Sequence, residues 1–173
     1  VLGRFAPALV VLACNTGSVV ALSDLRDRFD VPFVGVAPAV KPAAREAGAG
    51  GIVILSTART ADGEYLAGLI EDFAADTPVS IVAAGALVDF VERRFTPDRT
   101  DEARAAVREA ISGIDPAASD VVVLGCTHFT HLAAQIQREL GPAVRVMDSR
   151  AGVARRVAEL AGADAAPGRT TGE

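Results

Sequence analysis

The two cysteines of the chain are the residues whose type and setting best suit chemistry. Cys14 follows the apolar run 9–13, and Cys126 follows the apolar run 121–125. Both runs are short and rich in valine and leucine, as in buried strands, so each thiol stands where a strand ends and a helix begins. Unpaired amide groups and the positive end of the helix dipole at such a turn lower the pKa of a thiol. Both turns therefore predict acid/base thiols.

Two opposed thiols suit one reaction in particular. One thiolate removes a proton from one face of a carbon acid, and the other thiol returns a proton to the opposite face, which inverts the stereocentre without a cofactor. Asn15 and Thr16 beside the first thiol, and Thr127 and His128 beside the second, can hold a substrate carboxylate and stabilise the charge that develops. These residues predict a racemase with two bases.

Other interpretations of the same residues remain open. Free cysteine is among the most often buried residue types, so either cysteine alone also fits a structural role. Cys126, His128 and His131 stand close together in the sequence, and thiolate with imidazole suits zinc. No second cysteine or acidic ligand has zinc-finger spacing, and the glycines of 48–51 precede a strand instead of opening a helix. We therefore expect neither a metal nor a cofactor.

The elements that must position these residues alternate between strands and helices. Six short apolar runs read as buried parallel strands, and apolar residues recur at helical spacing between them. This order predicts an α/β fold with helices on both sheet faces and a site at the carboxyl ends of the strands. The strand-like runs are 9–12, 33–36, 52–55, 79–82, 121–124 and 144–147.

Composition narrows the class of protein further. A chain of 173 residues with 50% hydrophobic residues is one domain or two small ones and is not disordered. The net charge of -5, the absence of Trp and the single Tyr argue against nucleic-acid binding. No apolar run approaches the roughly 20 residues that cross a bilayer. With two cysteines and no leader, we expect a cytoplasmic protein with reduced thiols and no membrane contact.

Several motifs resemble the signatures of glutamate racemases, within the aspartate/glutamate racemase family. They occur in the order typical of that family and cover the chain from about residue 9 to residue 156. The strongest are Ala13–Ser18, Gly35–Ala43 and Leu124–Phe129, and the weaker ones are Ser56–Thr60 with Tyr65, and Met147–Ser149 followed by Ala154–Arg156.

The resemblance implies interconversion of L- and D-glutamate without a cofactor, which supplies D-glutamate for peptidoglycan and thus for cell wall organisation and cell shape. It implies that Cys14 takes the proton from the D enantiomer and Cys126 from the L enantiomer, and that His128 and Glu92 assist Cys126. Thr57 and Thr60 also fit a simple helix cap. The residues implied to contact the substrate are Asn15, Thr16, Thr57, Thr60 and Thr127.

The resemblance further implies two pseudo-symmetric parallel-sheet α/β domains with the substrate between them. We expect residues 1–37 and 147–173 to form part of the first domain and residues 38–146 to form the second. The family's opening strand with its Asp-Ser-Gly turn, and its Pro-Tyr-Gly loop, have no counterpart here. The first domain is therefore expected to be incomplete, and this N-terminally truncated chain to be inactive alone.

The resemblance leaves the regulation, the oligomeric state and the exact substrate open. Some family members are activated by a cell-wall nucleotide precursor, and this chain could belong to a monomeric or a homodimeric protein. Arg150 stands where the family usually has glycine, and Thr130 and His131 stand where Pro and Leu are common. A racemase for another acidic amino acid or a hydantoin, and a racemase-like module that binds its ligand without inverting it, are the alternative functions.

Overall fold

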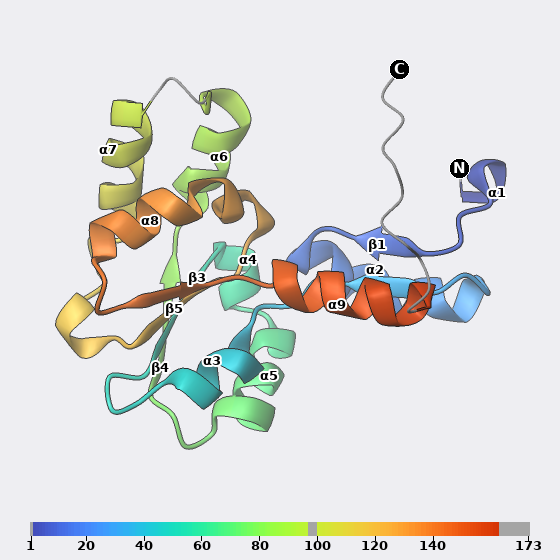
Figure 1. The fold of residues 1–173 in the computed structure, drawn as a ribbon, viewed down its shortest axis with the longest axis horizontal. Coiled ribbons are helices and arrows are strands. Elements are labelled where there is room, and N and C mark those ends of the chain that lie inside the picture. The colour runs from blue at the N-terminus through green and yellow to red at the C-terminus, as the bar shows by residue number, and fades with distance from the viewer. Residues whose placement is uncertain (1, 97–99, 163–173) are drawn as a thin grey trace.

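The chain folds into alternating strands and helices that form two parallel sheets (Figure 1). The computed structural model describes residues 2–96 and 100–162. Within these ranges the larger sheet has the strand order β4-β3-β5-β6 and the smaller sheet has the order β1-β2. Every strand pair is parallel, as the alternation of strands and helices predicts. The end of the expected first domain, residues 163–173, lies outside the described residues.

The larger sheet has two buried central strands and two edge strands. The central strands are β3 (Ile52–Ser56) and β5 (Val121–Leu124), and every one of their residues is buried. The edges are β4 (Val79–Ala83) and β6 (Arg145–Met147). Burial on both faces explains why the central strands read as continuous apolar runs without polar alternation.

Helices cover both faces of the larger sheet, and each face has its own core. Successive strand residues point to opposite faces, so Val53 and Leu55 belong to one core while Ile52 and Ile54 belong to the other. Figure 1 shows the two groups of helices on opposite sides of the strands. They are α6 (Gly85–Arg93), α7 (Thr100–Ala110) and α8 (Ala133–Leu140) on the first side, and α3 (Val40–Glu46) and α5 (Glu64–Ala74) on the second.

The smaller sheet consists of β1 (Val10–Leu12) and β2 (Phe33–Gly35), joined by α2 (Asn15–Arg28). A short helix, α1 (Leu2–Phe5), precedes it. After β6 the chain returns to this sheet as α9 (Arg150–Ala161), which lies beside it (Figure 1). Valine side chains of β1 and α2 are solvent-exposed here, so this half is covered less completely than the larger sheet.

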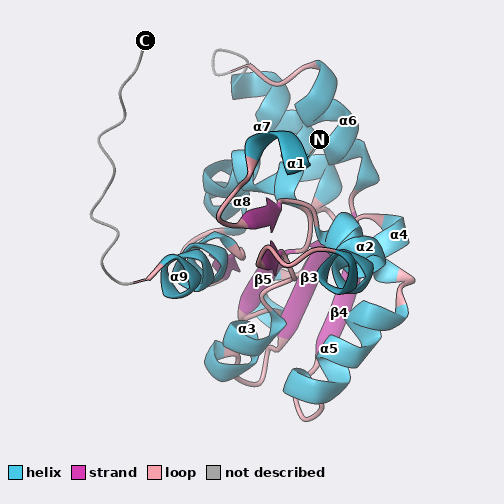
Figure 2. Cartoon of the chain, turned by 90° about the vertical axis from the view of Figure 1, so that its right-hand side faces the viewer, coloured by secondary structure: helices cyan, strands magenta, loops and turns pink. Residues whose placement is uncertain are grey.

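The smaller sheet lies beyond one end of the larger sheet (Figure 2). That end is the carboxyl end of the central strands, because α2 contacts α4 (Ala58–Ala61), the helix that directly follows β3. Both cysteine turns therefore lie at the carboxyl end of the larger sheet's central strands. No helix in the described ranges combines the length and the apolar character needed to cross a membrane.

Candidate active site

The first cysteine turn lies between β1 and α2. Cys14 is the residue before the first turn of α2, and its backbone is extended (φ -151°, ψ 127°). The amide of Gly17 donates a hydrogen bond to Cys14 Sγ at 3.4 Å, so the thiol caps the helix. Cys14 is exposed. An exposed thiol at a helix N-terminus is accessible to a substrate and faces free amide donors.

Ser18 holds this turn in place, a role that the sequence analysis missed. The side chain is buried, its Oγ donates to the carbonyl of Cys14 at 2.8 Å, and the amide of Val36 donates to the same Oγ at 2.8 Å. Through these two hydrogen bonds, Ser18 connects Cys14, which follows β1, with Val36, which directly follows β2. Its signal in the sequence is weak, because a serine one helical turn after a cap commonly bonds a preceding carbonyl.

The second cysteine turn follows the buried strand β5. The amide of Gly125 donates to the carbonyl of Leu55 at 2.7 Å, and a Cβ at position 125 would lie 3.1 Å from that carbonyl oxygen. Glycine is therefore needed where the two central strands end. Cys126 then opens the 3₁₀ helix η2 (Thr127–Leu132), whose Phe129 is completely buried in the core.

A histidine and a glutamate form a hydrogen-bonded chain behind Cys126. Cys126 Sγ lies 3.6 Å from His128 Nδ1, and His128 Nε2 lies 3.0 Å from Glu92 Oε1. An imidazole that donates from Nε2 to the carboxylate can accept the thiol proton at Nδ1. Glu92 is contributed by α6, which is distant in sequence from the turn. The structure thus brings together the three residues that the resemblance assigned to the second thiol.

The pKa of the Cys126 thiol is raised above its ordinary value. Burial of the thiol is the largest cause, and the negative charges of Cys14 and Glu92 raise the pKa further. The backbone amides of His128 and Phe129 act in the opposite direction. The expectation of a lowered pKa is therefore wrong for Cys126, because burial outweighs the amide donors of the turn.

Three threonine hydroxyls connect the first turn with the end of β3. Thr16 Oγ1 lies 3.4 Å from Thr60 Oγ1, which lies 3.1 Å from Thr57 Oγ1. Thr57 is also the N-cap of α4, where its side chain accepts a hydrogen bond from the amide of Thr60 at 3.4 Å. The capping role therefore occurs in the structure, and the hydroxyl of Thr60 also contacts Thr16 of α2.

Asn15 has the least satisfied side chain at the site. It is only 4% exposed, and neither its Nδ2 nor its Oδ1 has a hydrogen-bond partner within the described part of the chain. An unsatisfied buried polar group costs roughly 1–3 kcal/mol. A buried amide next to a cysteine turn, with both atoms free, is well suited to bind a polar ligand.

A cavity of about 580 Å³ lies beside the two turns and is lined by Thr127, although neither Cys14 nor Cys126 is among its lining residues. Ala13, which precedes Cys14, lines it together with Thr127, His128 and His131. The ring of His131 packs against Phe95, with ring centroids 6.1 Å apart. Across residues 2–96 and 100–162 no three His, Cys, Asp or Glu side chains converge as metal ligands.

Comparison with known proteins gives one consistent result. The family model described as "Asp/Glu/Hydantoin racemase" matches residues 4–157. A protein of Klebsiella pneumoniae (strain 342) named "Glutamate racemase" is 40% identical over 159 residues, which cover 91% of this chain and 56% of that protein. A "Glutamate racemase" of Shewanella sp. (strain MR-7) is 41% identical over 160 residues, covering 92% and 58%.

Solved structures agree with this result. The chain is similar to the crystal structure of Escherichia coli glutamate racemase in complex with L-glutamate and the activator UDP-MurNAc-Ala, with a TM-score of 0.80 and 37% identity. The match covers 92% of this chain and 60% of that one, so the chain spans little more than half the length of these relatives. The predicted α/β fold is confirmed. The chain belongs to the aspartate, glutamate and hydantoin racemase family.

Proposed function

We propose that the protein containing this chain interconverts L- and D-glutamate with two thiols as acid and base. One observation carries the proposal: Cys14 and Cys126 occupy equivalent positions after parallel strands, and a single cavity is lined by neighbours of both, Ala13 on one side and Thr127 and His128 on the other. Such a pair supplies one proton-transfer group for each face of a carbon acid. A module that only binds its ligand needs no second thiol.

The proposed reaction balances its protons between the two cysteines. The Cys14 thiolate removes the α-proton of D-glutamate, and the Cys126 thiol gives its proton to the opposite face of the same carbon, which forms L-glutamate. Cys14 is then a thiol and Cys126 a thiolate, ready for the reverse direction. The raised pKa of Cys126 fits its role as proton donor in the first direction. When Cys126 is protonated before the reverse direction, His128, held by Glu92, accepts its thiol proton and so forms the thiolate, and it returns a proton to Cys126 when that thiol must act as the acid.

The substrate contacts are assigned to polar side chains that surround the two thiols. The free amide of Asn15 and the hydroxyls near it can bind the carboxylates and the ammonium group of an amino acid, and preorganised donors stabilise the carbanionic transition state. Glutamate is favoured over another acidic amino acid or a hydantoin because relatives that are 40–41% identical to this chain are named glutamate racemases. The proposed contacts are Asn15, Thr16, Thr57, Thr60 and Thr127.

The biological role follows from this assignment. We assign the product D-glutamate to peptidoglycan synthesis, and the enzyme to the cytoplasm, where catalytic thiols stay reduced.

The proposal also covers domain organisation, activation and assembly. Residues 1–37 and 147–173 form part of one domain and residues 38–146 form the other. Activation by a cell-wall nucleotide precursor is included in the proposal, because the E. coli structure contains such an activator. The oligomeric state is either a monomer or a homodimer.

The test uses a racemase chimera, defined as the upstream segment of a curated glutamate racemase joined to residues 1–173. In deuterated water, the chimera is expected to exchange the α-proton of both glutamate enantiomers and to invert them, as followed by circular dichroism. Cys14→Ser and Cys126→Ser should each abolish inversion in both directions, because every turnover needs one base and one acid.

The controls separate the alternatives. Aspartate and hydantoins are tested as alternative substrates. If either compound is inverted faster than glutamate, that compound is the preferred substrate and the assignment of glutamate is wrong. Binding of glutamate without deuterium incorporation would identify a binding module. Near-normal turnover by either single cysteine variant in both directions would contradict the two-thiol mechanism. Omission of the upstream segment tests the expectation that the chain alone is inactive.

A further inference from the structure

The cavity beside the two cysteine turns has a positively charged wall. The basic side chains that line it belong to Arg150, His128 and His131, and no Asp or Glu of the described residues lines it. This one-sided charge occurs in a chain whose net charge is -5. The resemblance to racemases assigns no role to Arg150, so this arginine is a charge of the cavity that the proposed mechanism does not yet use.

Arg150 is placed near the second thiol because their strands are neighbours. β6 pairs in parallel with β5, and in this register Met147 lies opposite Val123. Arg150 and Cys126 each follow three residues later, at the same edge of the sheet. Neighbouring strands are roughly 5 Å apart, so the long side chain of an arginine spans the distance to the space in front of Cys126.

Asp148 holds the guanidinium group of Arg150 in place. Its Oδ2 accepts a hydrogen bond from Arg150 Nε at 2.8 Å and pairs with Nη2 at 2.6 Å, and its Oδ1 accepts from the backbone amide of Arg150 at 2.8 Å. Burial raises the pKa of Asp148, but the hydrogen bonds and the charge of Arg150 outweigh burial and hold this pKa below its ordinary value. The carboxylate therefore stays ionised at neutral pH, and the arginine keeps its orientation.

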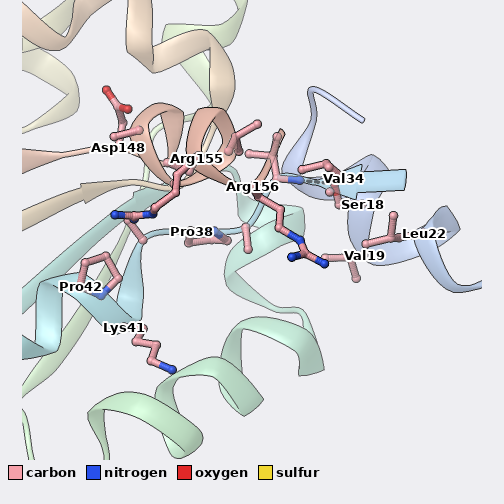
Figure 3. A pocket seen from close by; sticks show the side chains of 18 of the residues that line it. Ser18, Val19, Leu22, Val34, Pro38, Lys41, Pro42, Asp148, Arg155 and Arg156 are labelled. Atoms are coloured by element: carbon pink, nitrogen blue, oxygen red, sulfur yellow. Dashed lines mark hydrogen bonds between the residues drawn. The ribbon is translucent and has the colours of Figure 1, made fainter. Parts of the chain in front are cut away.

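Asp148 weakens the field of Arg150 only in part, because the two side chains line different cavities. The side chain of Arg150 is 67% exposed and lines the cavity beside the cysteine turns, whereas that of Asp148 is 13% exposed and lines a separate, larger cavity. Figure 3 shows this larger cavity, with Asp148 pointing away from Arg155 and Arg156. Among the residues that the structure describes, none bonds to Nη1 of Arg150, so the guanidinium group keeps donors for an anion.

The exposure of Arg150 indicates how it acts on a substrate. A solvent-exposed charge acts on ions as they approach, and a cleft lined by charges of one sign raises the local concentration of ions of the opposite sign. Glutamate has two carboxylates and one ammonium group, so it carries a net negative charge. An amino acid with an uncharged side chain carries none, and the field of the cavity does not favour its entry.

We infer that Arg150 is a substrate-recognition residue, which draws amino acids with an acidic side chain into the cavity and toward Cys126. The consequence for turnover rests on the proposed racemase function. The attraction of anions to the Cys126 thiol does not, because it depends only on the charge of Arg150 and on its position beside this turn. The two statements are therefore tested separately.

Alkylation of Cys126 in the 173-residue chain tests the attraction of anions. The thiolate displaces iodide from both anionic iodoacetate and neutral iodoacetamide, so the ratio of the two rates is independent of the fraction of thiolate. Arg150→Ala should lower this ratio about two- to fivefold at low salt, because a positive charge near the thiol is lost. At about 1 M NaCl the difference should largely vanish, since salt screens exposed charges. Mass spectrometry of the Cys126 peptide measures both rates.

Two further variants separate the charge from a structural effect. Arg150→Lys keeps the charge and should keep most of the ratio. Arg156→Ala removes another arginine of α9, which is 59% exposed and pairs with Glu159 at 3.0 Å but does not line this cavity, so the ratio should stay unchanged. An unchanged ratio in Arg150→Ala, an equal loss in Arg156→Ala, or a loss that persists at high salt would overturn the inference.

The consequence for turnover is measured in the racemase chimera. Arg150→Ala should raise KM for glutamate about two- to fivefold at low salt and change kcat less, because the charge acts before the chemical step. If the chimera inverts glutamate and its KM is the same with and without Arg150, the arginine does not recognise the substrate. If the chimera does not invert glutamate at all, the proposed function fails, while the alkylation ratio still decides whether Arg150 attracts anions.

Discussion

The two cysteine thiols differ in their surroundings although their local sequences are similar. Cys14 is exposed, whereas Cys126 is half-buried and lies near the carboxylate of Glu92. A raised pKa keeps the Cys126 thiol protonated until the pH rises above the range of an ordinary thiol. Alkylation requires the thiolate, so the reaction of Cys126 with iodoacetamide should reach half its maximal rate at a pH above that of a free cysteine. Mass spectrometry of the two cysteine peptides measures this rate for each thiol.

Replacement of one carboxylate tests the cause of this shift. Glu92→Gln removes a negative charge that disfavours the Cys126 thiolate, so the alkylation midpoint should move to lower pH. Asp89→Asn on the same helix removes an exposed carboxylate that pairs with Arg93 at 3.7 Å, and it should leave the midpoint unchanged. A shift to higher pH in Glu92→Gln, or equal shifts in both variants, would contradict the assigned electrostatics.

The two histidines of η2 provide a matched pair of variants in the racemase chimera. His128→Asn should lower turnover by about 10²–10⁴-fold, which is typical for loss of acid/base assistance. His131→Asn removes a ring that packs on Phe95 and has no contact with Cys126, so its turnover should change little. The two enantiomers have equal free energy, so kcat/KM must fall equally in both directions, but kcat should fall more when Cys126 is the base. Similar losses in both variants would argue against the role of His128.

At the scale of the elements, the site depends on how closely the ends of the strands approach one another. A Cβ on Gly125 would lie 3.1 Å from the carbonyl oxygen of Leu55, which is held in the central strand pair and cannot move freely. Gly125→Ala should therefore lower the free energy of unfolding by about 1–3 kcal/mol, the usual cost of overpacking. Urea denaturation of the chain measures this change.

The control for this substitution is Gly113→Ala. A Cβ at Gly113 meets no atom within 4 Å, and its backbone does not have a positive φ. The same chemical change should therefore leave the free energy of unfolding almost unchanged there. If Gly113→Ala destabilises the chain as much as Gly125→Ala, the close approach at the end of β5 is not the cause.

At the scale of the whole molecule, the two halves are supported unequally. Both buried core clusters are built from residues 39 onward, while the smaller sheet has two strands. Sheets with only two strands are marginally stable in water. Amide protons of β1 and β2 should therefore exchange with solvent about tenfold or more faster than those of β3 and β5 in the 173-residue chain. Hydrogen exchange followed by mass spectrometry checks this difference.

The racemase chimera supplies the comparison for this prediction. Its upstream segment should slow exchange in β1 and β2 and leave exchange in β3 and β5 almost unchanged. A parallel partner strand along the other edge of β1 would pair with its backbone groups and would reduce the exposure of Val11. Equal protection of both sheets in the chain alone would show that the smaller sheet needs no such support.

The sequence by itself determined the parallel α/β architecture and the placement of both thiols at strand ends. These features are local, because a run such as 121–124 reveals a buried strand by its own residues, and the cysteine after it must stand at the strand's end. The resemblance added Glu92, whose contact with His128 no local pattern could reveal.

Only the tertiary structure decided the electrostatics. The raised pKa of Cys126 results from burial and from charges on Cys14 and Glu92, which the fold brings near it. The contact between the hydroxyls of Thr16 and Thr60 likewise depends on two segments 44 residues apart in sequence meeting at the end of the larger sheet. Burial and charge interactions depend on distance in space, and this distance is set by how the two sheets pack and is not encoded in the spacing of residues along the chain.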